Sequence, residues 1–188
     1  LVTTPPAQSK PPIENNYNYY VLIEYSGYDQ DIDTEHFNHL LQASFKKGLI
    51  SDAVVAQNEK DRRNLWAIRD DVEQQFRLGP IKIFDISVPI NYMEDYLKEV
   101  RNNLSKNWSD FHCVVFGHLA DSNLHIIAGV GKGDKKSMKM IEECIYEPLR
   151  SFRGSVSAEH GIGMEKLNYL GISRTEEEIN LMRTLKKS

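Results

Sequence analysis

Residues 111–130, FHCVVFGHLADSNLHIIAGV, contain two apolar runs that are rich in strand-forming residues, 111–119 and 123–130. Only Ala120, Asp121 and Ser122 separate the two runs. Parallel neighbouring strands need a crossover of a dozen or more residues, so this short connection predicts an antiparallel hairpin. The flanking sequence must then supply further strands and the helices that cover the sheet.

Outside the hairpin, strand and helix patterns alternate along the chain. Strand composition and alternation predict strands over 17–26, 52–57 and 81–89. Helical spacing of apolar residues predicts helices over 34–47, 61–76, 91–107, 137–152 and 175–187. The glycine-punctuated segment 154–163 is predicted to be a loop or a short strand. Together these elements predict an α+β fold: a mostly antiparallel sheet with helices on one face and ferredoxin-like βαβ elements.

Composition and charge restrict the class of protein. The chain has 188 residues, of which 40% are hydrophobic and 27% charged, the usage of an ordinary folded domain. Its formal net charge of −4 gives no positive field for nucleic acid or anionic lipid. No apolar run reaches the roughly 20 residues that span a bilayer, and no secretion signal opens the chain. We expect a soluble domain of the cytoplasm or of an organelle matrix.

The N-terminal segment 1–16 contains four prolines among small polar residues, which favours a linker or domain boundary. We therefore expect the folded domain to span 17–188. The chain starts at Leu1 and ends at Ser188 in a basic helix, so we expect it to be a piece of a longer protein. Cys113 and Cys144 form no metal or disulfide pattern, which indicates reduced core thiols.

The hairpin carries two histidines, His118 and His125, on either side of its turn. Imidazoles on facing strands can ligate one divalent ion, and a carboxylate from Asp121 or Glu159 would complete the set. The alternative is that each histidine is separately satisfied by hydrogen bonds. The pair alone does not decide between them.

A second polar cluster lies in the segment GSVSAEHGIG, residues 154–163. Glu159 could reach the metal while the adjacent His160 faces a substrate, and an imidazole can take and return a proton near neutral pH. Gly161 and Gly163 permit backbone shapes that side chains forbid. The alternative is a helix start capped by Ser157 or Glu159.

Together the two segments resemble the C-terminal domain of the FAD-linked oxidases related to glycolate oxidase, D-lactate dehydrogenase and D-2-hydroxyglutarate dehydrogenase. The family pattern is G-H-x-G-D-G-N-L-H followed by S-A-E-H-G-x-G-x-x-K. Residues 117–118, Asp121, 123–125, 157–163 and Lys166 match it. The similarity extends to 65–69, 84–89 and 182–183, and so covers the chain roughly from Tyr17 onward.

The resemblance implies roles for six residues. His118, His125 and Glu159 would ligate a divalent metal, zinc or manganese, and His160 would be the general base. Asn123 would line the substrate site, and Arg69 would grip the substrate carboxylate with its planar charged fork. For Arg69 the alternative is a surface ion pair with Asp70 or Glu73. Lys82 is displaced from the family's second carboxylate-binding position, so no role is assigned to it.

The chain departs from the family at the turn, where Ala120 and Ser122 replace the glycines that flank Asp121. A tight turn with positive φ tolerates such residues less well than glycine. This departure affects the expected geometry between the two histidines, and so the metal site, more than the fold.

The implied function is oxidation of a small (D)-2-hydroxy acid to its 2-oxo acid, with hydride passing to FAD. The FAD-binding domain has no counterpart in these residues, so we expect it elsewhere in the same protein and expect the isolated chain to be inactive. The electron acceptor is not indicated. Two alternatives remain: a metal-dependent hydrolase, in which the same donors activate water, and a non-catalytic binding or assembly domain.

Overall fold

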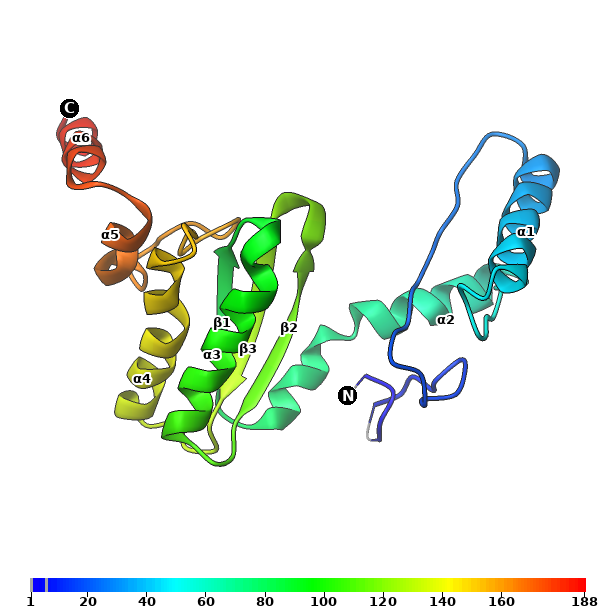
Figure 1. Ribbon diagram of the computed structural model, residues 1–188, viewed down its shortest axis with the longest axis horizontal. Helices are drawn as coiled ribbons and strands as arrows, with labels where there is room; N and C mark the ends of the chain where they lie inside the picture. The colour runs from blue at the N-terminus through cyan, green and yellow to red at the C-terminus, as the bar shows by residue number, and fades with distance from the viewer. Residues whose placement is uncertain (1, 6) are drawn as a thin grey trace. The chain divides into compact units, whose positions relative to one another are not determined.

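A computed structural model describes residues 2–5 and 7–188 of the chain. Its contacts divide the chain into two compact units, Leu1–Gln74 and Gln75–Ser188. Figure 1 shows the helices and strands of both units. Within the described residues, no helix combines the length and the apolar character needed to cross a bilayer.

The first unit contains two α-helices, α1 (Gln30–Lys46) and α2 (Glu59–Asp70). The Asp29 carboxylate accepts hydrogen bonds from two backbone N–H groups of the first turn of α1, as an N-cap residue should. Gly48 follows α1 with a φ of +66°, the left-handed conformation in which glycine commonly ends a helix. The helix predicted over 61–76 ends earlier, at Asp70, and a 3₁₀ segment, η1 (Val72–Leu78), continues from it.

The strands predicted over 17–26 and 52–57 are wrong, because neither segment forms a strand. The side chains of Tyr19 and Val21 are 89% and 77% exposed. β-branched and aromatic residues suit a pleated, half-buried surface, but they form a strand only where a neighbouring strand and a packed face exist. Among the described residues, neither segment is part of the three-stranded sheet.

The second unit contains a three-stranded antiparallel sheet made of β1 (Ile81–Ser87), β2 (His112–His118) and β3 (Asn123–Gly129). The strand order is β1-β3-β2, so the hairpin β2–β3 is confirmed and β3 is the central strand. A helix, α3 (Met93–Asn107), connects β1 to β2 and leaves between them the place that β3 fills. This order is that of a split βαβ unit.

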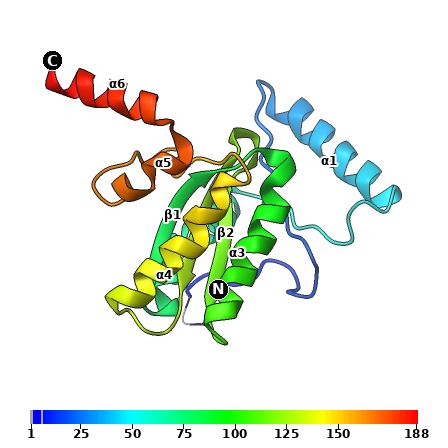
Figure 2. The same cartoon turned by 60° about the vertical axis from the view of Figure 1, so that its left-hand side comes forward.

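One face of the sheet is covered by α3 and α4 (Lys135–Tyr146), as Figures 1 and 2 show. The side chains of Phe84 and Ile86 in β1 lie opposite Ile126 and Leu124 in β3, and all four are buried in the core. The core also takes side chains from both helices and from the segment that follows α4: Tyr96, Val100, Leu104, Ile141, Ile145 and Leu149.

The other face of the sheet carries polar residues. Side chains alternate along a strand, so Asp85, His125 and Phe116 point away from the core residues beside them. The pairing of the strands places these three in one row, with Asp85 opposite His125 and His125 opposite Phe116. The sheet thus has an apolar face under the helices and a second face that presents the histidine pair.

Short turns and helices complete the second unit. They are η2 (Ile90–Tyr92), η3 (Leu119–Asp121), η4 (Glu147–Arg150), η5 (Leu167–Tyr169), α5 (Leu170–Ser173) and α6 (Glu176–Lys187). Thr175 caps the N-terminus of α6 with a capping box to Glu178. In the segment 154–163, Ser155 exchanges two backbone hydrogen bonds with Ser87 on the free edge of β1, and the rest is irregular.

Candidate functional site

His118, His125 and Glu159 lie together at one end of the sheet. Nε2 of His118 is 3.8 Å from Oε1 of Glu159, and Nε2 of His125 is 3.9 Å from Oε2. One ligand atom from each residue lies within 4.8 Å of the other two. Two imidazoles and a carboxylate are a donor set that divalent transition metals prefer. The three residues predicted from two separate motifs are therefore brought together by the fold.

The spacing of these donors suits a metal ion. Bonds of about 2.0–2.2 Å to a tetrahedral ion hold the ligand atoms roughly 3.4 Å apart. The distances of 3.8 Å to Oε1 and 3.9 Å to Oε2 are a few tenths of an ångström longer, and one ligand atom from each of the three residues lies within 4.8 Å of the others. Among the described residues, neither imidazole makes a side-chain hydrogen bond of ordinary length, so the arrangement differs from two separately satisfied histidines.

The hairpin places the two histidines. His118 is opposite Asn123 at the end of the ladder, His125 lies two residues further along β3 on the same face, and the imidazole centroids are 6.1 Å apart. Gly117 makes the close approach possible, because its φ is +154° and a Cβ there would lie 2.3 Å from the carbonyl oxygen of Asn123. Glycine at this position lets the strands stay paired up to the first histidine.

The two departures at the turn have different consequences. Ala120 lies within the short helix η3, which needs no positive φ. Ser122 has a φ of 58°, in the left-handed region. Its N–H donates to Leu119 and its carbonyl accepts from Val88, at 3.1 and 3.0 Å, and these bonds hold the turn. The strain expected of the turn is thus confined to Ser122.

Asp85 organises the loop that supplies Glu159 and was missed as a site residue in the sequence. Its Oδ2 accepts hydrogen bonds from the backbone N–H groups of Ala158, Glu159 and His160 at 3.1, 2.9 and 2.8 Å, and from Oγ of Ser157 at 3.2 Å. The available signal was a lone acid inside the apolar strand 81–87. A buried acid is expected to be paired or hydrogen-bonded, so such an acid indicates a specific partner.

The environment of Asp85 favours its charged form. Burial raises the pKa of the carboxyl, since only 1% of the residue is exposed. The backbone N–H groups of His160 and Glu159, together with the nearby charges of His160 and Lys166, lower the pKa by more, and it lies below its ordinary value. Nζ of Lys166, the last residue of the second motif, is 3.7 Å from Oδ2.

His160 follows Glu159 and is exposed. Its ring stacks on that of His125, with centroids 5.6 Å apart and an angle of 22° between the planes. Gly161 and Gly163 both have positive φ, as their place in the motif predicts. No helix begins at Ser157 or Glu159, so the alternative of a capped helix start is wrong; the next helical turn is η5, at Leu167.

Asn123 contacts the carboxylate of the cluster. The residue is 1% exposed, and its Nδ2 donates to Oε1 of Glu159 at 2.7 Å. This bond holds Glu159 from the sheet side. The role of Asn123 in lining a substrate site stays a prediction.

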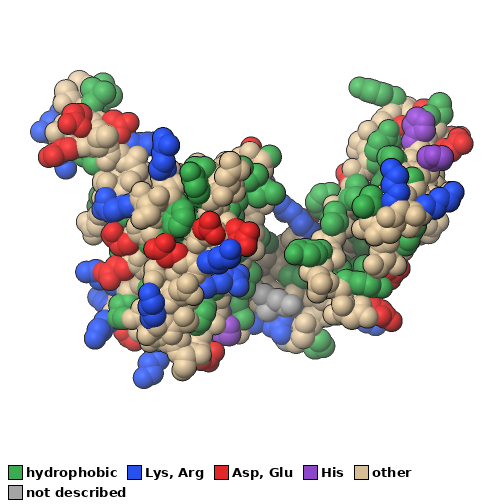
Figure 3. All heavy atoms as spheres, viewed as in Figure 1, with side chains coloured by type: hydrophobic (Ala, Val, Ile, Leu, Met, Phe, Trp, Pro, Cys, Tyr) green, Lys and Arg blue, Asp and Glu red, His purple; other side chains and the backbone are tan. Residues whose placement is uncertain are grey.

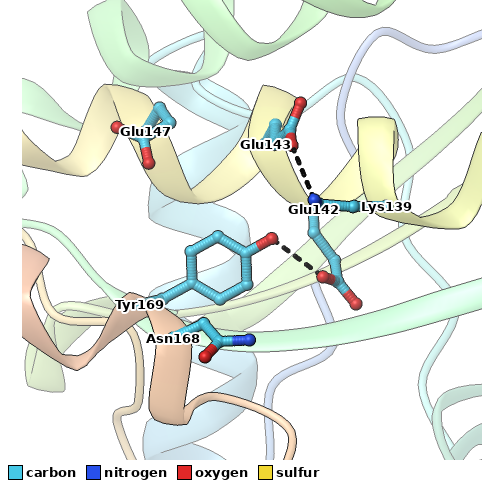
Figure 4. A pocket seen from close by; sticks show the side chains of 6 residues that line it. All are labelled: Lys139, Glu142, Glu143, Glu147, Asn168 and Tyr169. Carbon is cyan, nitrogen blue, oxygen red and sulfur yellow. Dashed lines mark hydrogen bonds and ion pairs between the residues drawn. The ribbon is translucent and has the colours of Figure 1, made fainter. Parts of the chain in front are cut away.

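The two basic residues considered for substrate carboxylates belong to α2 and β1. Arg69 is in α2 of the first unit, where its Nη1 forms an exposed ion pair with Asp70 at 3.0 Å, the neighbour named in the alternative. Its role as a carboxylate grip stays a prediction. Lys82 lies opposite Ala128, on the core side of the sheet, and pairs with Glu142 of α4. The other oxygen of Glu142 accepts from the hydroxyl of Tyr169 at 2.8 Å (Figure 4).

Acidic and basic side chains are interspersed over the visible face of the second unit (Figure 3). This mixture agrees with the small net charge of −4. The site is therefore defined by its local donors and not by a broad charged field.

A two-histidine, one-carboxylate cluster with an adjacent histidine, built on a split βαβ sheet, defines a candidate metal-assisted catalytic domain. The chain belongs to the family of FAD linked oxidases, C-terminal domain, whose sequence model matches residues 4–188. The resemblance seen in the two motifs is thereby confirmed.

The chain is also similar to complete dehydrogenases. It is 34% identical over 178 residues to the mitochondrial D-2-hydroxyglutarate dehydrogenase of Arabidopsis thaliana, covering 94% of this chain and 31% of that protein. A putative mitochondrial D-lactate dehydrogenase of Schizosaccharomyces pombe is 34% identical over 185 residues, 93% of this chain and 35% of that protein. The chain is 30% identical over 180 residues to the D-2-hydroxyglutarate dehydrogenase of Stutzerimonas stutzeri, and the match covers 93% of this chain and 39% of that protein. The chain thus spans about a third of the length of these relatives.

Proposed function

We propose that the chain is the substrate- and metal-binding part of a flavin-dependent dehydrogenase that oxidises a small (D)-2-hydroxy acid to the 2-oxo acid. The observation that carries the proposal is the convergence of His118, His125 and Glu159, with His160 beside them. Membership of the FAD linked oxidase family and similarity to proteins named D-2-hydroxyglutarate and D-lactate dehydrogenases support the substrate class.

His118, His125 and Glu159 would hold a divalent ion, zinc or manganese. The side chains of His118 and Glu159 are 49% and 48% exposed, so a ligand can approach the cluster from outside the sheet. An ion bound there would lower the pKa of a substrate hydroxyl. Asn123 keeps the Glu159 carboxylate turned toward the histidines through its hydrogen bond.

His160 would act as the general base, with one ring nitrogen taking the proton of the substrate hydroxyl. Its backbone N–H is fixed by Asp85, and its ring rests against His125, so its position relative to the cluster is defined. Arg69 would bind the substrate carboxylate with its guanidinium. Such positioning of the reacting groups supplies a large part of a catalysed rate.

FAD would accept the hydride and would be held mainly by another domain of the same protein. The sequence has no glycine-rich dinucleotide fingerprint, which fits that division of labour. Two of the relatives described above carry the word mitochondrial in their names, which supports an organelle matrix as the compartment of this protein.

The base assignment is tested in the full-length protein by following the reduction of bound flavin after mixing with D-2-hydroxyglutarate or D-lactate. His160→Ala should retain its flavin, because FAD would be held mainly by another domain of the same protein, and should lose flavin reduction by about 10²–10⁴-fold. His112 is half-buried at the start of β2 and lies outside the cluster, so His112→Ala provides the control. Flavin reduction at the wild-type rate in His160→Ala would contradict the assignment.

The metal assignment is tested by elemental analysis of purified wild-type protein and His118→Ala. We expect one zinc or manganese ion per wild-type chain and loss of that ion in the variant. Ester or phosphoester cleavage that disappears in His118→Ala, without any flavin reduction, would instead support a metal-dependent hydrolase. Absence of both metal and activity from the full-length wild type would support a binding or assembly domain.

A further inference from the structure

The strand residue Asp85 has one carboxylate oxygen for which the loop provides no donor. Oδ2 takes the backbone N–H groups of Ala158, Glu159 and His160, whereas Oδ1 is buried and has no hydrogen-bond partner. Nδ1 of His125 lies 3.8 Å from Oδ1. Leaving a carboxylate oxygen buried and unpaired costs free energy, so the group that Oδ1 faces needs to be identified.

The sheet itself holds the two side chains face to face. Asp85 and His125 are directly paired in the β1–β3 ladder and lie on the same side of it. The imidazole is confined between Phe116 and His160, whose ring centroids are 5.2 and 5.6 Å from its own. The ring therefore presents Nδ1 to Asp85 and Nε2 to Glu159, which lies 3.9 Å away.

A neutral imidazole carries a proton on one nitrogen and a free lone pair on the other. Only the nitrogen without a proton can ligate a metal, and its partner nitrogen then needs an acceptor. Oδ1 of Asp85 is an acceptor without a donor, and it faces the nitrogen on the opposite side of the ring from Glu159. A movement of about 1 Å would bring the pair to hydrogen-bond distance.

We propose that Asp85 is a positioning residue: its Oδ1 accepts the Nδ1–H of His125 and thereby reserves Nε2 of His125 for the cluster with His118 and Glu159. This inference rests on the proposed function. The same carboxylate fixes the loop that carries Glu159 and His160, so one buried side chain aligns both halves of the site.

Asp85 could be considered a ligand itself, because Asp85, His125 and His160 also offer atoms within 4.8 Å of one another. Three features argue against that role. Oδ2 is already occupied by the loop, and Oδ1 faces Nδ1 of His125 rather than the open side of the cluster. Asp85 is also 1% exposed, whereas the side chains of His118 and Glu159 are about half exposed.

The discriminating variant is Asp85→Asn in the full chain. The amide oxygen can still accept the three backbone N–H groups, while the amide NH₂ turns to Nδ1 of His125 and requires that nitrogen to accept. The imidazole proton then moves to Nε2, where it blocks ligation. The matched control is Glu142→Gln, which neutralises a partly buried acid paired with β1 on the other face of the sheet.

Two measurements report the position of the His125 proton and its effect on metal binding. Nitrogen-15 NMR of the metal-free chain reports which nitrogen of His125 carries the proton, and calorimetric titration with Zn²⁺ alone reports affinity. We expect the Nδ1–H tautomer in the wild type and in Glu142→Gln, and the Nε2–H tautomer in Asp85→Asn. We expect the zinc affinity of Asp85→Asn to fall by about 10–100-fold and that of Glu142→Gln to stay at the wild-type value.

An Nε2–H tautomer of His125 in the wild type would overturn the inference, and this measurement needs no variant. Wild-type zinc affinity in Asp85→Asn would overturn it as well. If the wild-type chain binds no zinc, the metal-binding part of the proposed function fails, and the tautomer alone decides whether Asp85 orients the ring.

Discussion

Asp85 joins a strand to a loop that lies 72 to 75 residues further along the chain. Local sequence pointed to the candidate site residues on both sides of this connection, because His118, His125, Glu159 and His160 stand in two recognisable motifs. It did not identify Asp85 as part of the site, because the role of a single buried carboxylate depends on which backbone N–H groups the folded chain brings to it.

The charge of Asp85 should make stability depend on pH. Its pKa is lower in the folded chain than in the unfolded chain, so its contribution is complete above the unfolded value of about 3.9 and is lost as pH falls through the folded value. At pH 7, Asp85→Asn should unfold with about 1–3 kcal/mol less free energy than the wild type. Urea unfolding at pH 7 and pH 3 measures this difference, which should shrink at the lower pH; an equal difference at both would contradict the expectation.

At the scale of elements, the sequence predicted most helices and the hairpin correctly, but it also predicted two strands that do not form. The helices α1, α3, α4 and α6 overlap the ranges that apolar spacing predicts, because that signal acts within a few residues. The segments 17–26 and 52–57 have strand composition but no partner strand. Pairing depends on residues far along the chain, so composition alone overestimates strands.

The turn of the hairpin offers a direct test of backbone strain. Ser122 has a φ of 58°, a conformation that costs a residue with a side chain about 1 kcal/mol or more relative to glycine. Ser122→Gly should therefore raise the free energy of unfolding by about 1 kcal/mol, measured by urea denaturation. Its backbone hydrogen bonds to Leu119 and Val88 are unaffected by the change.

The neighbouring departure provides the control. Ala120 lies in η3 without a positive φ, so Ala120→Gly should lower the free energy of unfolding by about 0.5–1 kcal/mol. If Ser122→Gly and Ala120→Gly both raised the free energy of unfolding, or if neither did, backbone strain at Ser122 would not explain the difference expected between the two positions.

At the scale of the whole molecule, burial is concentrated in the second unit. Among the described residues, every buried hydrophobic side chain lies between Phe84 and Tyr169, and α1 and α2 bury none. The sequence predicted amphipathic helices in both units and did not indicate that only the second unit would bury hydrophobic side chains. Whether Arg69 contributes to a substrate site likewise depends on contacts between residues that are far apart in the sequence.

This uneven burial should appear in hydrogen exchange of the full chain. Amides of β3 and α3 should exchange slowest, because opening them exposes the core, whereas amides of α1 and α2 should exchange by local opening and lose protection first. Exchange monitored by mass spectrometry at pH 7 resolves these segments. Protection of α1 equal to that of β3 would contradict the expectation.

The two faces of the sheet also limit how this chain can change in length. Inserting or deleting one residue within β3 would turn Ile126 outward and His125 into the apolar layer under the helices, so core and site would fail together. Segments between elements, such as 131–134, are under no such constraint. Viable length variants of this domain should therefore differ in their connections, while β1 and β3 accept only substitutions.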